Sequence, residues 1–181
     1  MFYKRSRLSV ADARTDGRPA ADIFARSIVR IIPSKFETVV YVDDRKFVKG
    51  SASGFTYGLN NCLIHTLQQA LNLTIGQVVA DLPWIRNQLM KQFPRFGPTA
   101  VTHDNYLDLT EHWKAIIDLI SQSARLNGCD PLRKFSHTSF QIICIDEIIR
   151  TVGTCEGDGP TKLYILNEGR RHFVPLIRNM A

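Results

Sequence analysis

No apolar run in the sequence is long enough to span a bilayer, and the basic residues 1–8 are not followed by the apolar core of a secretory signal peptide. We therefore expect no transmembrane segment and no classical secretion. The four cysteines form no C-x-x-C pair, and no Cys/His cluster has zinc spacing. The sequence thus gives no sign of a metal site, a cofactor or a disulfide framework, and reduced thiols in the cytosol are the simplest account.

The positive charge is concentrated at one end of the chain. Residues 1–30 contain seven basic and three acidic side chains, which supply four of the six net positive charges. Such a stretch can bind nucleic acid, but no aromatic interleaving and no nucleic-acid motif accompany it, so we interpret it as a solvated lead-in. We divide the chain into this lead-in, residues 1–36 with a short helix over 20–32, and one domain over residues 37–181.

Hydrophobic periodicity predicts the elements of that domain. Helical spacing begins after residue 61, after Asp81 and after Asp108, and a short acidic or amide side chain before each helix can accept from the free N–H groups of the first turn. Thr74 is expected to cap a further segment over residues 75–80. Strand patterns appear in the following ranges: 39–42, 46–49, 140–145, 162–166 and 172–177. Residues 51–60 and 157–160 are expected to be loops.

The order of these elements predicts the fold class. Apart from an early hairpin over residues 39–49, helices come first and a small, mainly antiparallel sheet follows them. This arrangement is typical of an α+β protein.

Cys62 is the first candidate for chemistry. It lies in the first turn of a predicted helix, where Asn60 or Asn61 can serve as N-cap and where free N–H groups favour a thiolate over a thiol. A lone cysteine is more often a small buried hydrophobe, so this position alone does not establish a catalytic role. We interpret the other three cysteines, Cys129, Cys144 and Cys155, as structural.

His172 is the second candidate. It opens the last predicted strand directly after a polar turn, and a nucleophilic cysteine needs a base within hydrogen-bond reach. A cysteine at a helix N-terminus with a histidine much later on a strand is how papain-like hydrolases are assembled. Without Cys62, His172 would be interpreted as a surface residue.

These residues also carry a resemblance to a known family. Asn61-Cys62-Leu63 before a helix resembles the Asn-Cys-Leu of the OTU (ovarian tumour) cysteine peptidases, and residues 162–177, with His172-Phe173, are similar to that family's closing strands. The resemblance spans roughly residues 37–181. It implies a papain-like α+β fold, Cys62 as nucleophile, His172 as general base and ubiquitin or a ubiquitinated protein as partner, with the Asn60/Asn61 pair in the site.

The sequence departs from the family pattern in two places. Leu59-Asn60 stands where the family has Asp-Gly, and Val174 stands where it often has a polar residue that orients the histidine. The third member of a triad is therefore open, with Asn179, Asp146 and the Asn60/Asn61 pair as candidates. The sparse match resembles the effector-like or toxin-like branches of the family, which act in the cytosol after delivery into a host cell.

Two alternatives stay open. Cys62, His103 and Asp118 have spacings similar to those of bacterial effectors that deamidate glutamine, although Asp118 falls in a predicted helix and His103 in a loop. The chain can also be a binding module without catalysis, including an inactive relative that binds ubiquitin. We expect a cysteine-dependent deubiquitinase that hydrolyses ubiquitin–lysine isopeptide bonds, with no nucleic-acid partner.

Overall fold

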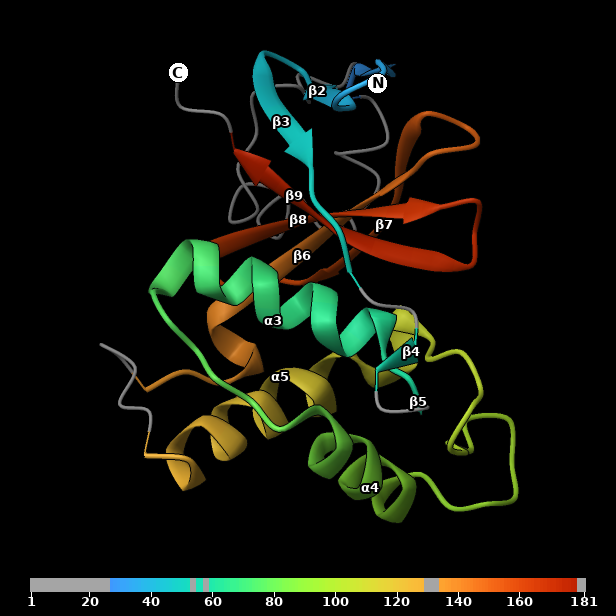
Figure 1. The fold of residues 1–181 in the computed structure, drawn as a ribbon, viewed down its shortest axis with the longest axis vertical. Coiled ribbons are helices and arrows are strands. Elements are labelled where there is room, and N and C mark those ends of the chain that lie inside the picture. Colours follow the sequence, from blue (N-terminus) through green and yellow to red (C-terminus); the bar gives the residue numbers. More distant parts are fainter. Residues whose placement is uncertain (1–26, 53–54, 57–58, 129–133, 179–181) are drawn as a thin grey trace, which may run out of the picture.

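The structure, a computed structural model, describes residues 27–52, 55–56, 59–128 and 134–178. In these described residues the fold is α+β, and a curled, seven-stranded mixed sheet is covered on one face by three helices (Figure 1). The helices are α3 (Cys62–Ile75), α4 (Leu82–Gln92) and α5 (Leu109–Leu126), followed by the 3-10 turn η2 (His137–Ser139). No helix in this described part is long and apolar enough to cross a membrane.

The strands of the sheet come from both ends of the domain. Their order is β1-β2-β3-β9-β8-β6-β7, and a separate two-stranded ribbon pairs β4 (Phe55–Thr56) with β5 (Leu59–Asn60). The sheet strands have these bounds: β1 Val29–Ile32, β2 Val39–Val42, β3 Arg45–Lys49, β6 Phe140–Asp146, β7 Thr151–Gly157, β8 Thr161–Glu168 and β9 His172–Arg178.

The expected helices-first order and mainly antiparallel sheet need correction. Strands β1 to β3 precede the helices, and β3 then pairs with the last strand, β9, which closes the sheet across the whole sequence. β6 and β8 run parallel because the chain makes the antiparallel strand β7 at the edge before it returns to the other side of β6. The sheet is therefore mixed.

The early hairpin is confirmed, and the helix before it is not. β2 and β3 pair across a two-residue turn in which Asp43 adopts a positive φ of 54°, a conformation that aspartate tolerates better than most residues. Residues 29–32, expected to end a helix, form β1 instead, because their alternate side chains pack into the core of the sheet. The rest of that expected helix lies outside the described residues.

Two of the predicted helix caps are confirmed. The Asp81 carboxylate accepts from the N–H of Trp84 at 3.0 Å, and the Asp108 carboxylate accepts from the N–H of Glu111 at 2.9 Å. The expected capping by Thr74 is wrong. Helix α3 runs on to Ile75, and the Thr74 hydroxyl donates to the carbonyl oxygen of Ala70 within the helix.

The sheet separates two hydrophobic cores. Along β6 and β8, side chains alternate between a core shared with the helices and a second core enclosed by the curled strands. Figure 1 shows α3 lying along the sheet, with α5 and α4 on its other side. The first turn of α3 thereby reaches β9, which brings the two ends of the domain together.

Candidate active site

Cys62 is the first residue of α3, as the sequence predicts. Its side chain is buried, with 3% of its surface exposed, because the helix packs its apolar stripe into the larger core. Asn61 occupies the N-cap position with a φ of −109°, but its side chain makes no capping hydrogen bond. The expected amide cap is therefore wrong, and the helix start depends on packing instead.

The first turn of α3 lies against a free edge of β9. β3 pairs only with the far half of β9, so the near half, which contains Phe173, has no strand on that side. The Thr66 hydroxyl donates to the carbonyl oxygen of Phe173 at 2.7 Å, and the backbone of Phe173 acts to lower the pKa of the nearby Cys62 thiol. In antiparallel pairing, the N–H and C=O of one residue point to the same side of the strand, so both backbone groups of Phe173 face α3.

Opposing effects act on the Cys62 thiol. Burial is the largest and raises its pKa above the ordinary value. The backbone N–H groups of Phe173 and Leu63 and the positive charge of Arg86 lower the pKa but do not offset burial. In this structure the thiol is therefore protonated at neutral pH, contrary to the thiolate that the helix N-terminus favours on its own. A nucleophilic role then requires a base.

Arg86 is a residue that the sequence analysis did not identify. It lies on α4 with 0% of its surface exposed, and among the described residues its guanidinium donates to oxygen atoms of Asn60 at the end of β5 and of the loop after α4. One nitrogen donates to the carbonyl oxygen of Asn60 at 2.7 Å, and the others donate to Thr102 and Asn105 at 2.6–3.0 Å. Arg86 therefore fixes the segment that leads into Cys62 and places a positive charge near the sulfur.

Asn60 also lies beside the first turn of α3, which carries Cys62. Only 2% of its surface is exposed, and neither its amide nitrogen nor its amide oxygen has a hydrogen-bond partner among the described residues. An unpartnered buried amide costs free energy, and such groups are concentrated at functional sites. Its backbone is held by Arg86, so the amide lies on a fixed segment two residues before the nucleophile.

His172 begins β9 after a three-residue turn, as expected. In the β8–β9 register it lies opposite Glu168, whose carboxylate accepts from the Lys49 ammonium at 3.0 Å. Directly opposite residues have Cβ atoms about 5 Å apart, so Glu168 is within reach of the imidazole. Glu168 was not identified from the sequence, although the length of the turn determines this pairing.

The structure brings Cys62 next to the backbone at His172 but does not join the two side chains. Phe173 packs into the helix-side core, whereas Val174 and Leu176 pack into the core inside the curled sheet. Because side chains alternate along a strand, His172 begins on the face opposite α3. Among the described residues, no hydrogen bond links the Cys62 sulfur to the His172 ring.

Asp146, one of the expected third members of a triad, is not at His172. The Asp146 carboxylate accepts from the N–H groups of Ile148 and Ile149 and pairs with Arg170, which ties it to the turn after β6. β8 lies between β6 and β9, so Asp146 is about 10 Å from β9 at two strand spacings. Asn179 lies outside the described residues.

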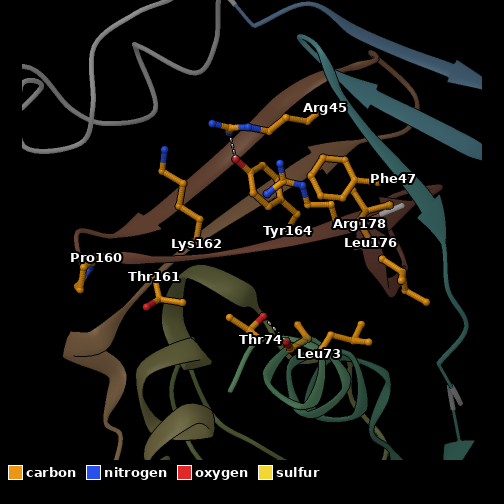
Figure 2. A pocket seen from close by; sticks show the side chains of 12 residues that line it. Arg45, Phe47, Leu73, Thr74, Pro160, Thr161, Lys162, Tyr164, Leu176 and Arg178 are labelled. Atoms are coloured by element: carbon orange, nitrogen blue, oxygen red, sulfur yellow. Dashed lines mark hydrogen bonds between the residues drawn. The ribbon is translucent and has the colours of Figure 1, made fainter. Parts of the chain in front are cut away.

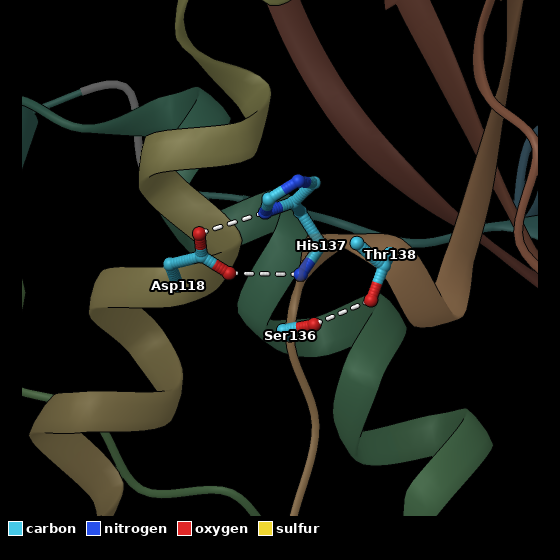
Figure 3. Close-up of polar contacts among 4 residues, drawn as sticks. All are labelled: Asp118, Ser136, His137 and Thr138. Atoms are coloured by element: carbon cyan, nitrogen blue, oxygen red, sulfur yellow. Dashed lines mark hydrogen bonds and ion pairs between the residues drawn. The ribbon is translucent and has the colours of Figure 1, made fainter.

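The structure does not assemble the alternative triad. The Asp118 carboxylate accepts from the backbone N–H of His137 at 2.8 Å and pairs with its ring nitrogen Nδ1 at 2.7 Å (Figure 3). The ring also meets Trp113 edge-on at 5.9 Å between ring centroids. Asp118 thus ties η2 to α5, while His103 lies exposed in a loop. Both observations argue against His103 and Asp118 as partners of Cys62.

The remaining cysteines lie apart from this turn. Cys144 is buried in β6, and burial raises the pKa of its thiol to about 12. Cys155 in β7 is half-buried, and burial likewise raises its pKa to about 12. Raised pKa values keep both thiols protonated at neutral pH, which is compatible with the structural role expected for them, whereas Cys129 lies outside the described residues. No group of three metal-binding side chains gathers in the described part of the chain.

Comparisons with protein-family models, with curated proteins and with solved structures gave no match for this chain.

Proposed function

We propose that this protein is a cysteine-dependent hydrolase that cleaves ubiquitin–lysine isopeptide bonds, with Cys62 as nucleophile and His172 as general base. The observation that carries the proposal is the hydrogen bond of the Thr66 hydroxyl on α3 with the carbonyl oxygen of Phe173 at 2.7 Å, which holds the start of α3 against the residue after His172. This contact brings Cys62, the buried first residue of α3, near the residue after His172. The ubiquitin part rests on the resemblance of residues 61–63 and 162–177 to the OTU family.

His172 supplies what the buried thiol lacks. Because burial raises the pKa of Cys62, the sulfur becomes a nucleophile only when a base removes its proton. For this role the His172 ring has to leave the face opposite α3 and approach the Cys62 side of β9. Hydrogen bonds of catalytic groups often tighten only when substrate is bound, so the separated side chains are compatible with this role.

Glu168 is the residue that we propose to orient His172. It is the directly opposite residue on β8, and one of its carboxylate oxygens pairs with Lys49 while the other faces no described hydrogen-bond donor. A carboxylate beside an imidazole can hold the ring in one orientation. Glu168 would then take the place of the polar residue that is absent at Val174.

Asn60 and the backbone N–H of Cys62 supply the donors for the oxyanion. Attack of the thiolate on the carbonyl carbon places negative charge on the carbonyl oxygen, and fixed donors near this oxygen stabilise the transition state. The Asn60 amide is buried, unpartnered among the described residues and held on a segment that Arg86 fixes. These are the properties of a preorganised donor.

The proposed reaction has two steps. In the first, His172 takes the Cys62 proton, the sulfur bonds to the carbonyl carbon, and the lysine amine leaves with the proton that His172 returns to it. In the second, His172 takes a proton from water, the hydroxide attacks the thioester, and the Cys62 thiolate is released with a free ubiquitin carboxylate. Water is the only co-reactant.

Hydrolysis of a fluorogenic amide at the C-terminus of ubiquitin tests this proposal. We expect Cys62→Ser and His172→Gln to lower kcat/KM by at least about a hundredfold, since each removes a group that acts in the transition state. Glu168→Gln should lower kcat by a smaller factor. His103→Gln serves as the matched control and should leave the rate unchanged. Full activity of Cys62→Ser would contradict the proposal.

A further inference from the structure

One face of the sheet carries an apolar row that crosses four strands. Ile177 lies on the same face of β9 as Phe173, which packs against the helix-side core, because alternate residues of a strand share a face. Residues paired directly with it on the neighbouring strands continue the row on this face. From β9 to the edge strand β1 the register gives this order: Ile177, Val48, Val39 and Ile32.

The helices cover only part of this face. Figure 1 shows α3, α4 and α5 toward the bottom of the view, below β8 and β9, and shows β2 and β3 at its top. A cavity of about 640 Å³ lies where the cover ends, with Leu73 on its helix side and Tyr164 on its strand side (Figure 2). No helix in the described residues packs over β1 or β2. The apolar row therefore continues past the helices to the edge of the sheet.

Large apolar side chains are exposed around the outer end of the row. Ile32 is 48% exposed on β1, Phe36 is 92% exposed in the loop between β1 and β2, and Ile28, directly before β1, is 68% exposed. The loop is held in place because the Ser34 hydroxyl donates to the carbonyl oxygen of Glu37 and accepts from its N–H. Exposed apolar side chains concentrated in one region indicate a surface that contacts another molecule.

Basic side chains border the apolar row on both sides. Arg30, Tyr41 and Lys46 are paired in register on β1, β2 and β3, two positions along each strand from the apolar row. The Arg30 guanidinium lies over the Tyr41 ring, 4.5 Å from its centroid. On the other side of the row, the Lys35 ammonium lies over the Phe36 ring at 5.9 Å.

The positive charge of the chain is concentrated in the same part of the sequence. Residues 1–50 contain eleven Lys or Arg and six Asp or Glu, a net charge of +5. The whole chain has a net charge of +6, so the rest of the sequence contributes only +1. An exposed apolar surface with positive charge around it matches a partner that is apolar inside and anionic at its surface, as an anionic lipid bilayer is.

We propose that the face of β1–β3 with the apolar row binds an anionic lipid surface, with Ile32 and Phe36 inserted below the headgroups and Arg30, Lys35 and Lys46 at the headgroups. Stable attachment to a membrane takes two signals, and this region supplies an apolar one and a basic one. Nucleic acid is the less suitable partner, because single strands are bound on stacking aromatic rings and not on exposed isoleucines. The proposal is independent of the hydrolase function, since Cys62 and His172 lie outside this face.

Co-sedimentation of the full chain with lipid vesicles tests the proposal. Vesicles of phosphatidylcholine alone are compared with vesicles that contain about one-third phosphatidylserine, at about 0.1 M and about 0.5 M NaCl. We expect binding to the phosphatidylserine vesicles to be at least about tenfold tighter, and to weaken at the higher salt concentration because salt screens the charges. No binding to these vesicles at either salt concentration would overturn the proposal.

Matched substitutions separate insertion of the apolar side chains from attraction by charge alone. Phe36→Ser, in an exposed loop, should weaken binding to the phosphatidylserine vesicles by about tenfold or more, because a large ring no longer leaves water. Phe96→Ser removes a ring that is 90% exposed in the loop after α4, and should change binding less than twofold. Equal weakening in the two variants, or no weakening in Phe36→Ser, would overturn the proposal.

Two other occupants of this face give different results in the same experiments. If a second copy of the chain covers the face, analytical ultracentrifugation without vesicles shows a dimer that Phe36→Ser dissociates. If the charge serves nucleic acid, a labelled RNA or DNA duplex binds the parent protein and Phe36→Ser equally, and neither protein binds the vesicles. Either result would overturn the proposal.

Discussion

Replacing Arg86 by leucine would test how the segment before Cys62 is held. The guanidinium makes five hydrogen bonds, and the substitution leaves the carbonyl oxygens of Asn60, Thr102 and Asn105 without this donor. Each buried carbonyl that loses its partner costs about 1–3 kcal/mol. Leucine avoids the cost of burying a charge, which offsets part of this loss. We therefore expect the free energy of unfolding to fall by about 3 kcal/mol, measured by urea denaturation.

The same substitution should change the chemistry of the thiol. Arg86 lowers the pKa of Cys62, so its removal raises that pKa further above the ordinary value. The pH profile for alkylation of Cys62 by iodoacetamide, followed by peptide mass, should shift to higher pH. Arg86→Lys is the matched control: it keeps the charge but cannot reproduce the fork of donors, so it should destabilise the protein with a smaller shift of the profile. Unchanged stability and an unchanged alkylation profile for Arg86→Leu would refute this account.

Three further predictions follow from other contacts. Burial raises the pKa of Cys144 to about 12 in the folded protein, so the unfolded chain loses this proton first as pH rises. The free energy of unfolding should therefore fall above pH ~8.5, by about 1.4 kcal/mol per pH unit for this thiol. Cys144→Ala should make this fall with pH less steep. Thr66→Val removes the hydroxyl that donates to the carbonyl oxygen of Phe173, so α3 packs less firmly on β9. The free energy of unfolding in urea should fall by about 1–2 kcal/mol, and the rate of hydrolysis of the ubiquitin amide should fall as well. Asp118→Ala breaks a half-exposed pair with His137 and should cost less than about 1 kcal/mol by the same measurement, with hydrolysis unchanged.

Each of these has an outcome that counts against it. If the free energy of unfolding of Cys144→Ala falls with pH as steeply as that of the parent protein, other groups cause the loss of stability at alkaline pH. Thr74→Val removes a hydroxyl that bonds only within α3 and should leave hydrolysis unchanged, so an equal loss in both threonine variants would argue against a specific contact with β9. A large loss of activity in Asp118→Ala would restore the alternative triad.

Local signals in the sequence predicted α3, α4 and α5, but they wrongly predicted a helix through residues 29–32 and a further segment over 75–80. Asp81 and Asp108 cap α4 and α5 through side chains that reach only three residues ahead, so the sequence alone contains this information. The hairpin of β2 and β3 is local in the same sense. The α+β class was predictable because these periodic segments are long and distinct.

The elements that were missed depend on distant partners. β1 has apolar residues at positions that also fit a helix, and only its pairing with β2 makes it a strand. β7 is rich in threonine and glycine and is ordered by its pairing with β6, where a Cβ at Gly153 would lie only 3.2 Å from Asp146. The mixed sheet could not be predicted for the same reason, since a parallel pair of β6 and β8 follows from where β7 lies.

The candidate site divides in a similar way. Cys62 and His172 were predicted from their places at a helix start and a strand start, and the structure brings their backbones together through Phe173. Arg86 was missed because an arginine in an amphipathic helix usually faces solvent, and only the surrounding carbonyl oxygens make its burial favourable. Glu168 was missed because its position opposite His172 depends on the register of β8 and β9.

The central claim is that Cys62 is a nucleophile directed at ubiquitin, and reaction with ubiquitin that carries a C-terminal thiol-reactive electrophile tests it most directly. Intact mass and peptide mapping would be compared for the parent protein, Cys62→Ala, and Cys155→Ala as a matched thiol control. We predict one ubiquitin adduct on Cys62, absent from Cys62→Ala and unchanged in Cys155→Ala. A folded parent protein that forms no adduct, or an adduct that persists in Cys62→Ala, would contradict the claim.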